Sequence, residues 1–406
     1  MKKIIIILLS CLLGSETVVP VRAQAKIDAS AAIMVDASTG QIIYEQNANK
    51  KLPIASITKL LTMAVIYDQL DHHSINYNTK VKVTPAIAEI SNNPLYSKVG
   101  LQRGNSYSVK TLINAAMVKS ADGATVALAL ASGKPLSDFT MKMNEKARVI
   151  GLRDYTIINP TGLTNDQMLQ FKIPNKKANL ENQMTAHDVA ILTRYLVSKH
   201  PEILRVTARP TAKIPIAKDN VTSVANLNQM LPGGTYSVPG MTIDGLKTGT
   251  SAKAGACFVS TGLYQGHRII TVVLHTNGAN PDNRFIQTQN LYQSLKTDYH
   301  LQSIRLPQRI TKQRLGKSRQ RYLATQSQQI HVWVSGKMSS YTLALDIDDR
   351  LLKHQELQPP IKRGERLGTV TLTSPGVKSV NGDRLDYPLY SQQTVHRQNI
   401  LQRLFQ

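Results

Sequence analysis

Cysteine is nearly absent from this sequence, which has only two among its 406 residues, at positions 11 and 257. Cys11 lies in an N-terminal segment that we expect to be removed, so Cys257 would remain alone and an internal disulfide is excluded. Cys257 stands in the apolar run 256–259. A small buried core residue is the expected role there, rather than a reactive thiol.

Acidic residues are also scarce: 26 Asp and Glu face 49 Lys and Arg, which gives a formal net charge of +23. Such a charge often indicates nucleic acid as the partner. For an exported chain we predict instead that no nucleic acid binds and that the charge favours another polyanion, such as anionic lipid head groups or acidic wall polymers. A solvated basic surface without a special partner is the alternative.

Long hydrophobic runs are missing after the first residues. Lys2 and Lys3 precede the apolar stretch 4–13, and Ala23-Gln24-Ala25 has the small-x-small form of a cleavage site. This pattern predicts a secretory signal peptide over residues 1–25, cut after Ala25. No later run reaches 18 apolar residues, so no spanning helix is expected. The sequence therefore predicts export to the outer face of the cytoplasmic membrane or to the cell wall.

The remaining length suggests two or three domains, and a hydrophobic fraction of 42% is enough to form their cores. Residues 26–297 combine a predicted hairpin, several helices, two adjacent strands and a last helix, which is typical of a mixed α/β domain. The expected elements are residues 31–36, 41–45, a helix that carries Ser56 and runs to about residue 70, and residues 109–132, 139–150, 185–199, 256–263, 268–275 and 282–294. Turns are expected at residues 38–40, 159–163 and 265–266, and residues 71–106 read as loops. Thr185 is the expected N-cap of its helix, and Gly151 ends the helix over 139–150.

Two further segments follow this domain. Residues 298–390 hold short β-like runs separated by Gly and Pro, a pattern that predicts a small all-β domain. Residues 391–406 place Ile400, Leu401, Leu404 and Phe405 on one side of a predicted amphipathic helix. This helix could bind an anionic membrane surface or pack on the β domain, and the sequence leaves both readings open.

The chemistry is centred on Ser56 and Lys59, just after Pro53. Residues three apart project from one face of a helix, so the hydroxyl and the amine can meet. Serine needs an adjacent base to act as a nucleophile, and lysine can be that base only when it is neutral, which burial favours. The tetrapeptide alone is more often a capping serine followed by a solvated lysine.

Two other short motifs favour the reading of Ser56 and Lys59 as a nucleophile and its base. Ser120-Ala121-Asp122 lies at a break between two helical runs, and Lys247-Thr248-Gly249 lies on a predicted strand. Together with Ser56-x-x-Lys59 they form, in this order, the motif set of penicillin-binding proteins and serine β-lactamases.

The surrounding sequence resembles one branch of these proteins, the low-molecular-weight penicillin-binding proteins that act as serine-type D-alanyl-D-alanine carboxypeptidases. The likeness covers about residues 28–280 and includes residues 32–40, 159–163 and 245–249. It implies an α/β (α+β) transpeptidase/β-lactamase-like domain followed by a C-terminal all-β domain. It also implies no cofactor and no metal, a peptidoglycan stem peptide as the substrate, and β-lactams as inhibitors.

The resemblance implies catalytic roles for three residues, which the chemistry of their side chains supports. Ser56 would attack the carbonyl between two D-alanines and form an acyl-enzyme. Neutral Lys59 would accept the Ser56 proton, and Ser120 could pass a proton to the leaving amine.

Substrate binding is assigned to the third motif in the same way. Lys247 would hold the terminal carboxylate with help from Thr248 and Thr250, and its charge would keep Lys59 deprotonated. Gly249 would let the strand edge approach the substrate. The backbone N–H groups of Ser56 and Thr250 would form the oxyanion hole.

One position departs from the family, because the second motif usually ends in asparagine and here ends in Asp122. An ionised carboxylate only accepts hydrogen bonds, and it would raise the pKa of Lys59. We expect Asp122 to be protonated, to pair with a lysine, or to alter activity.

Two other functions compete with a carboxypeptidase. A serine β-lactamase needs fast deacylation, yet no clear Glu-x-x-Leu-Asn segment lies between the second and third motifs. A catalytically weak penicillin-binding wall protein, disabled by Asp122, is opposed by the intact Ser56, Lys59 and Lys247.

Overall fold

A computed structural model describes residues 5–9, 26–217, 220–316, 318, 320–338 and 340–397. The chain divides into two compact units. The larger unit comprises Gln24–Ser38 and Tyr44–Ser294, and the smaller unit comprises Met1–Ala23, Thr39–Ile43 and Leu295–Gln406. The fold combines an α/β transpeptidase domain with a C-terminal β-rich domain, as the sequence predicts.

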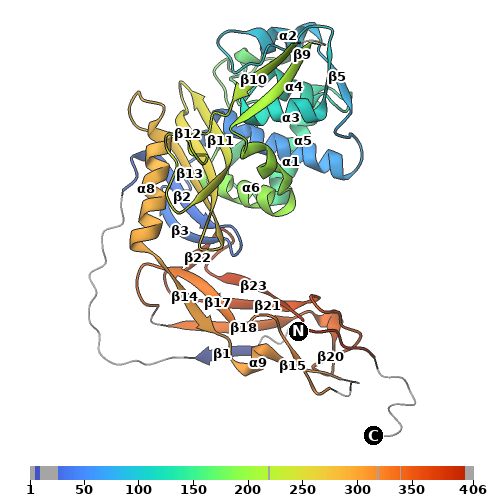
Figure 1. Ribbon diagram of the computed structural model, residues 1–406, viewed down its shortest axis with the longest axis vertical. Coiled ribbons are helices and arrows are strands. Elements are labelled where there is room, and N and C mark those ends of the chain that lie inside the picture. Colours follow the sequence, from blue (N-terminus) through green and yellow to red (C-terminus); the bar gives the residue numbers. More distant parts are fainter. Residues whose placement is uncertain are drawn as a thin grey trace. The chain divides into compact units, whose positions relative to one another are not determined.

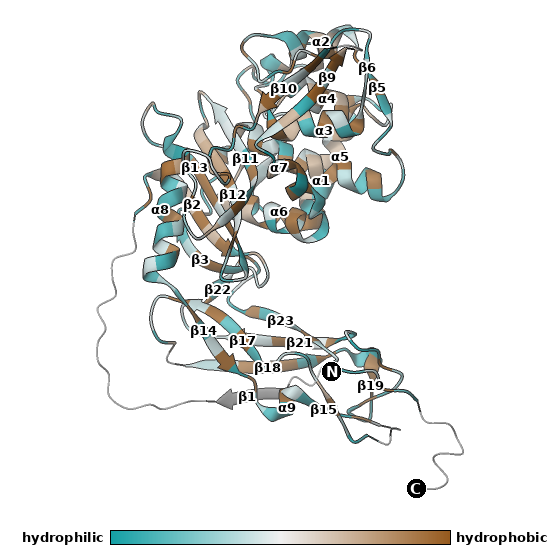
Figure 2. Cartoon of the chain, viewed as in Figure 1, coloured by the Kyte–Doolittle hydropathy of each residue, from teal (hydrophilic) through white to brown (hydrophobic). Residues whose placement is uncertain are grey.

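The larger unit contains an antiparallel sheet whose strands follow the order β11-β12-β13-β2-β3 (Figure 1). Helix α8 packs on β12, where Tyr292 bonds Ser260 and Phe285 stacks edge-on against Phe258. Figure 2 shows hydrophobic residues concentrated on these strands and hydrophilic residues along much of α8. The strands are β2 (Ala29–Asp36), β3 (Gln41–Gln46), β11 (Thr242–Ser251), β12 (Gly255–Tyr264) and β13 (His267–Thr276).

The helices of this unit carry most of the remaining core, and α1 is buried almost throughout. Thr185 caps α6 by accepting from the Asp188 backbone N–H, and Gly151 ends α5 with φ +93°, both as the sequence indicates. The helices are η1 (Ala55–Thr58), α1 (Lys59–Asp71), α2 (Pro85–Asn92), α3 (Val109–Val118), α4 (Asp122–Ala129), α5 (Leu136–Ile150), η2 (Asp166–Phe171), α6 (Ala186–Lys199), α7 (Glu202–Thr207) and α8 (Asn283–Asp298).

Some elements of this unit were not expected from the sequence. Helix α2 lies in a stretch that we read as loops, because its eight residues give too short a periodic signal. A hairpin of β9 and β10 was also missed, since its turn lacks a Gly or Pro signal. The short strands are β4 (Leu52–Pro53), β5 (Lys80–Lys82), β6 (Ser106–Ser108), β7 (Tyr155–Thr156), β8 (Gln183–Met184), β9 (Thr211–Ala217) and β10 (Asn220–Ala225).

The smaller unit is rich in strands and has two hydrophobic clusters of its own. Its largest sheet has the order β1-β18-β21-β23, and β14 pairs with β17. Its elements are β1 (Ile5–Leu9), β14 (His300–Arg305), α9 (Gln308–Thr311), β15 (Lys312–Arg314), β16 (Tyr322–Ala324), β17 (Gln329–Val334), β18 (Tyr341–Ile347), η3 (Asp349–Leu351), β19 (Leu352–Lys353), β20 (Glu356–Leu357), β21 (Arg366–Thr373), β22 (Lys378–Ser379) and β23 (Leu385–Tyr390).

The predicted tail helix needs a correction at its start. Residues 391–397 are not helical: Ser391 forms a bridge with Thr325, and Val395 exchanges backbone hydrogen bonds with Ile361. Val395 is 5% exposed, because it packs into a hydrophobic cluster of this unit. Residues 398–406, which hold the apolar face of the predicted helix, lie outside the described residues.

Strand β1 falls within the predicted signal peptide and pairs antiparallel with β18. Signal cleavage after Ala25 stays a prediction. In the described part of the chain, no helix is both long and apolar enough to cross a membrane.

Candidate active site

The three sequence motifs converge in the larger unit. Ser56 lies in the 3₁₀ turn η1, and Lys59 begins α1 immediately after it. Ser120 and Asp122 lie where α3 ends and α4 begins, and Lys247 lies on β11. Tertiary folding brings these five side chains, separated by up to 191 positions in the sequence, into two hydrogen-bonded sets. The sets are close enough for the charges of Lys59 and Asp122 to act on Lys247.

Ser56 and Lys59 form the expected pair. Lys59 Nζ donates to Ser56 Oγ at 2.7 Å, and the Lys59 side chain is fully buried while Ser56 is partly exposed. Lys59 Nζ also lies 2.7 Å from Asp122 Oδ1 and 2.9 Å from the Thr161 carbonyl. A neutral amine can donate to those two acceptors and turn its lone pair toward the Ser56 hydroxyl, which is the arrangement that a general base requires.

Two opposing effects act on the pKa of Lys59. Burial, the larger effect, lowers the pKa of Lys59, and the Asp122 carboxylate raises it through charge and a hydrogen bond. The net direction is downward, so the amine form needed for a base becomes more accessible. Asp122 therefore pairs with a lysine, one of the outcomes that the sequence left open.

The second pair is Ser120 with Lys247. Lys247 Nζ donates to Ser120 Oγ at 2.9 Å and to the Thr248 carbonyl at 3.0 Å. Burial lowers the pKa of Lys247 well below its usual value, and the nearby charges of Lys59 and Arg284 lower it further. We expected the charge of Lys247 to lower the pKa of Lys59. Burial is the main cause of the lowered pKa of Lys59. Repulsion between the two lysines shows instead at Lys247, whose pKa the charge of Lys59 lowers.

Both the side chain and the backbone of Asp122 form hydrogen bonds with the backbone of Ser97. Its carboxylate accepts from the Ser97 backbone N–H at 3.2 Å through Oδ2, and its own backbone N–H donates to the Ser97 carbonyl at 2.9 Å. The side chain is 4% exposed. Residue 97 thus anchors a loop to the second motif, a contact for which the sequence gave no signal.

The turn at residues 159–163 holds the nucleophile segment in place. Gly162 has φ +85°, and a Cβ at this position would lie 1.9 Å from the Ala55 carbonyl oxygen. Asn159 Oδ1 accepts from the backbone N–H groups of Thr161 and Gly162, which fixes the turn. The carbonyl of Thr161 then points at Lys59. The sequence indicated a turn here and a likeness to the family, but gave no role in positioning Ser56 or Lys59.

Gly249 has a similar steric role on the other side. A Cβ at Gly249 would lie 2.6 Å from the Ile54 carbonyl oxygen, so β11 can approach η1 only without a side chain there. We expected this glycine to make room for the substrate. The structure shows instead that it makes room for the backbone of Ile54, two residues before Ser56.

Arg284 was missed by the sequence reading, since nothing at the start of α8 sets it apart from other surface arginines. It is 7% exposed, and its Nη1 donates to Thr250 Oγ1 at 2.9 Å and to the Gly249 carbonyl at 3.1 Å. Thr250 itself is exposed. Arg284 thus fixes the orientation of a threonine that faces solvent beside the motif.

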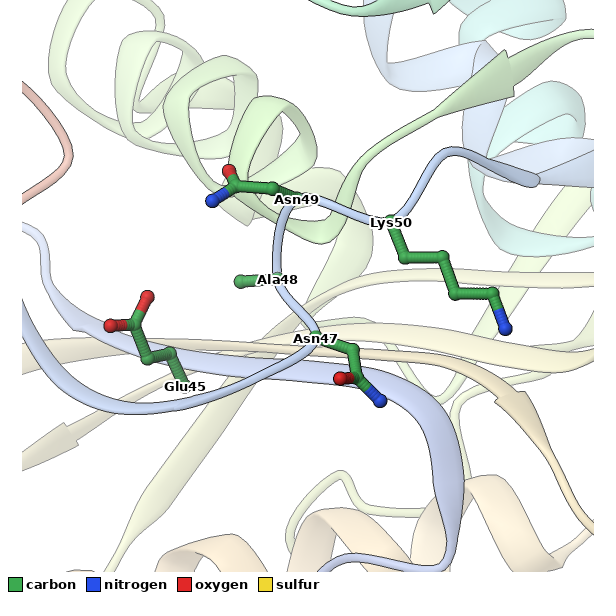
Figure 3. A pocket seen from close by; sticks show the side chains of 5 residues that line it. All are labelled: Glu45, Asn47, Ala48, Asn49 and Lys50. Atoms are coloured by element: carbon green, nitrogen blue, oxygen red, sulfur yellow. The ribbon is translucent and has the colours of Figure 1, made fainter.

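A surface hollow lies at another place in the larger unit. It is lined by Glu45 and by residues 47–50, in the segment between β3 and β4 (Figure 3). None of its lining residues belongs to the three motifs. The Ser56 group is the candidate active site instead, because a serine hydroxyl lies against the amine of a buried lysine there.

Cys257 is fully buried, as expected, and burial raises the pKa of its thiol to about 11. Within the described residues, no group of three or more His, Cys, Asp or Glu side chains is placed to hold a metal ion.

Comparison with known proteins identifies the family. Residues 18–278 match the peptidase S11 family, described as D-alanyl-D-alanine carboxypeptidase. The chain belongs to this family of serine-type, low-molecular-weight penicillin-binding proteins.

Individual relatives show how far the likeness extends. The D-alanyl-D-alanine carboxypeptidase DacF of Bacillus subtilis (strain 168) is 25% identical over 351 residues, which are 86% of this chain and 82% of that protein. A crystal structure of a peptidoglycan synthesis regulatory factor (PBP3) from Streptococcus pneumoniae has a TM-score of 0.79 and 28% identity, and covers 92% of this chain and 100% of its own.

A second solved structure matches a shorter part. Penicillin-binding protein D2 from Listeria monocytogenes, in its ampicillin-bound form, has a TM-score of 0.55 and 28% identity. It covers 67% of this chain and 98% of its own. Both solved structures therefore contain the fold that brings the three motifs together.

Proposed function

We propose that this protein removes the terminal D-alanine from peptidoglycan stem peptides through an acyl-enzyme on Ser56. The observation that carries the proposal is the 2.7 Å contact between Ser56 Oγ and the Nζ of fully buried Lys59. Burial lowers the pKa of Lys59, which favours the neutral amine. A serine hydroxyl next to such an amine is an activated nucleophile.

The proposed reaction begins when Ser56 Oγ attacks the peptide carbonyl and Lys59 accepts its proton. The backbone N–H groups of Ser56 and Thr250 would stabilise the developing oxyanion, since such donors act most strongly where water is excluded. Ser120, 2.9 Å from Lys247, would pass a proton to the departing D-alanine amine. Water would then hydrolyse the ester and release the shortened peptide.

Recognition of the terminal carboxylate would fall to the third motif. Arg284 supplies a cation, Lys247 an amine that can take up a proton, and Thr248 and Thr250 supply hydroxyl groups along the same strand. Burial makes the charged form of Lys247 unfavourable in the free site, as its lowered pKa shows. A bound carboxylate would stabilise that charge, so substrate binding should be accompanied by proton uptake at Lys247.

The direct test is turnover of a peptide that ends in D-Ala-D-Ala, with release of free D-alanine as the readout. Release of D-alanine supports the carboxypeptidase, and its absence with intact penicillin labelling would indicate a catalytically weak wall protein. Rapid turnover of penicillin itself would indicate a β-lactamase. β-Lactams are the proposed inhibitors, because they present a reactive carbonyl and a carboxylate to the same groups.

We also propose that the chain is exported and works on the outer face of the cytoplasmic membrane or in the cell wall. The N-terminal signal pattern and the wall substrate support this location. The domain limits 26–297 and 298–390 remain part of this proposal.

Replacing Asp122 with asparagine should keep the protein active and shift the acidic limb of its pH–rate profile to lower pH. The Asp122 carboxylate raises the pKa of Lys59, so its removal should lower that pKa and make the neutral base available at lower pH. Asp138→Asn, at a half-buried position in the first turn of α5 and outside the Lys59 group, is the control. An acidic limb that stays in place in D122N would show that Asp122 does not affect the titration of the base.

Replacing Lys247 with alanine should weaken the use of peptides that have a free terminal carboxylate. A hydrogen bond to a charged group contributes about 1.5–3 kcal/mol, so kcat/KM should fall by roughly 10- to 150-fold. The same peptide with a terminal carboxamide should lose much less. Lys253→Ala, an exposed residue after the same strand, is the control. Equal losses on both peptides would contradict a carboxylate-binding role.

A further inference from the structure

The smaller unit has a short hairpin of β15, labelled in Figure 1, and β16. Its two faces differ chemically. Gln313 pairs with Leu323, whereas Arg314 pairs with Tyr322 and Lys312 with Ala324. Cross-strand partners lie on the same face of a hairpin. Because Leu323 is fully buried, its face points inward, and Lys312, Arg314 and Tyr322 lie on the outward face.

The outward face is basic and has one aromatic ring. Lys312 and Arg314 are exposed, and Tyr322 is 50% exposed. Two more exposed arginines flank the hairpin, Arg309 in α9 and Arg321 just before β16. Arg314 pairs with Glu356 only at 3.9 Å, with 72% of the Arg314 side chain exposed, so this contact barely neutralises the charge.

The hairpin is held firmly from beneath. Leu323 and Leu315 belong to a buried cluster of the smaller unit that also contains Leu357, Ile361, Leu367 and Val395. Because the backbone that carries these cations is fixed, it loses little conformational entropy on binding a surface. The same cations on a free loop would lose more.

The last described residues of the chain contact the base of this hairpin. The Gln392 backbone N–H donates to the Ala324 carbonyl at 2.9 Å, and Ser391 forms a bridge with Thr325. The last described residues therefore pass the base of β16 and then pair with Ile361 through Val395. They tie the hairpin to the rest of the smaller unit.

We propose that the outward face of the β15–β16 hairpin is a contact site for an anionic lipid bilayer surface. Lysine and arginine side chains near such a surface are attracted to its phosphate groups, and tyrosine has an amphipathic ring suited to the head-group level. The exposed tyrosine among the cations favours a bilayer over a water-dissolved polyanion. The contact is peripheral and should weaken with salt.

The test compares two variants of the full chain that each remove one exposed lysine and one exposed arginine. The hairpin variant is Lys312→Ser with Arg314→Ser. The control is Lys337→Ser with Arg384→Ser, whose arginine likewise has a weak exposed ion pair, with Asp386 at 3.4 Å. Thermal unfolding of both variants confirms that the fold is retained.

Binding is measured by co-sedimentation with vesicles of phosphatidylcholine containing phosphatidylglycerol, and with vesicles of phosphatidylcholine alone. We expect the hairpin variant to bind the anionic vesicles about tenfold or more weakly than the control, with Tyr322→Ser also weakening binding. Equal binding by the two double variants would overturn the proposal. So would a hairpin variant that keeps vesicle binding but loses binding to soluble poly(glycerol phosphate), since the site would then recognise a polymer.

Discussion

Replacing Ser56 with alanine is expected to abolish both D-alanine release and covalent labelling by penicillin, with the fold intact. Ser56 Oγ is the hydroxyl that Lys59 Nζ contacts at 2.7 Å, so its removal leaves the base without a nucleophile. Ser56 is only partly buried, and deleting one hydroxyl group creates little empty volume. Intact-protein mass spectrometry after incubation with penicillin measures the adduct directly.

Ser251→Ala is a suitable comparison for this experiment. Ser251 lies at the end of β11, where its hydroxyl binds Glu181 at 2.7 Å and takes no part in the Lys59 group. This variant should still form the adduct. A penicillin adduct on Ser56→Ala, located by peptide mapping to another residue, would refute Ser56 as the nucleophile.

Replacing Gly162 with alanine should destabilise the protein and slow acylation. An alanine Cβ would lie 1.9 Å from the Ala55 carbonyl, next to the nucleophile, in a backbone conformation with φ +85° that alanine disfavours. Strain of this kind combined with overpacking costs roughly 2–5 kcal/mol in the free energy of unfolding. If the turn moves instead, a displacement of about 1 Å at Ser56 could slow acylation about 100-fold.

Gly151→Ala separates the cost of the positive φ from the cost of the close contact. Gly151 has a similar φ of +93°, but a Cβ there would meet nothing within 4 Å. Denaturant unfolding should show a loss of about 1 kcal/mol for this variant and normal acylation. If G162A and G151A lose equal stability and acylate at equal rates, the close contact with Ala55 does not position the nucleophile.

The sequence predicted the elements whose signals are local. Pro53 and the apolar run after it indicated the start of the Ser56 helix, and Gly151 marked the end of α5. Thr185 was readable as a cap because its hydroxyl satisfies a backbone N–H within its own turn. The hairpin signals near residues 38–40 and 265–266 succeeded for the same reason.

Elements that depend on distant contacts were not predictable in this way. Residues 391–397 are not helical, because Ser391 and Val395 find backbone partners in Thr325 and Ile361. The apolar residues that suggested a tail helix, 400–405, lie outside the described residues. Helix α2 is short, and its fit against α4 comes from Gly123, where a Cβ would lie 2.4 Å from Ser91. Neither of these contacts can be recognised from residues that are neighbours in the sequence.

For the candidate site, the sequence by itself determined which residues are proposed to react: Ser56, Lys59, Ser120 and Lys247 follow from three short motifs in a fixed order. Only the tertiary structure decided their electrostatic state. The burial that lowers the pKa of Lys59, the ion pair that Asp122 makes with it, and the position of Arg284 beside Thr250 all depend on groups far apart in the chain. Charge and desolvation act through space, whereas a motif records only neighbours along the chain.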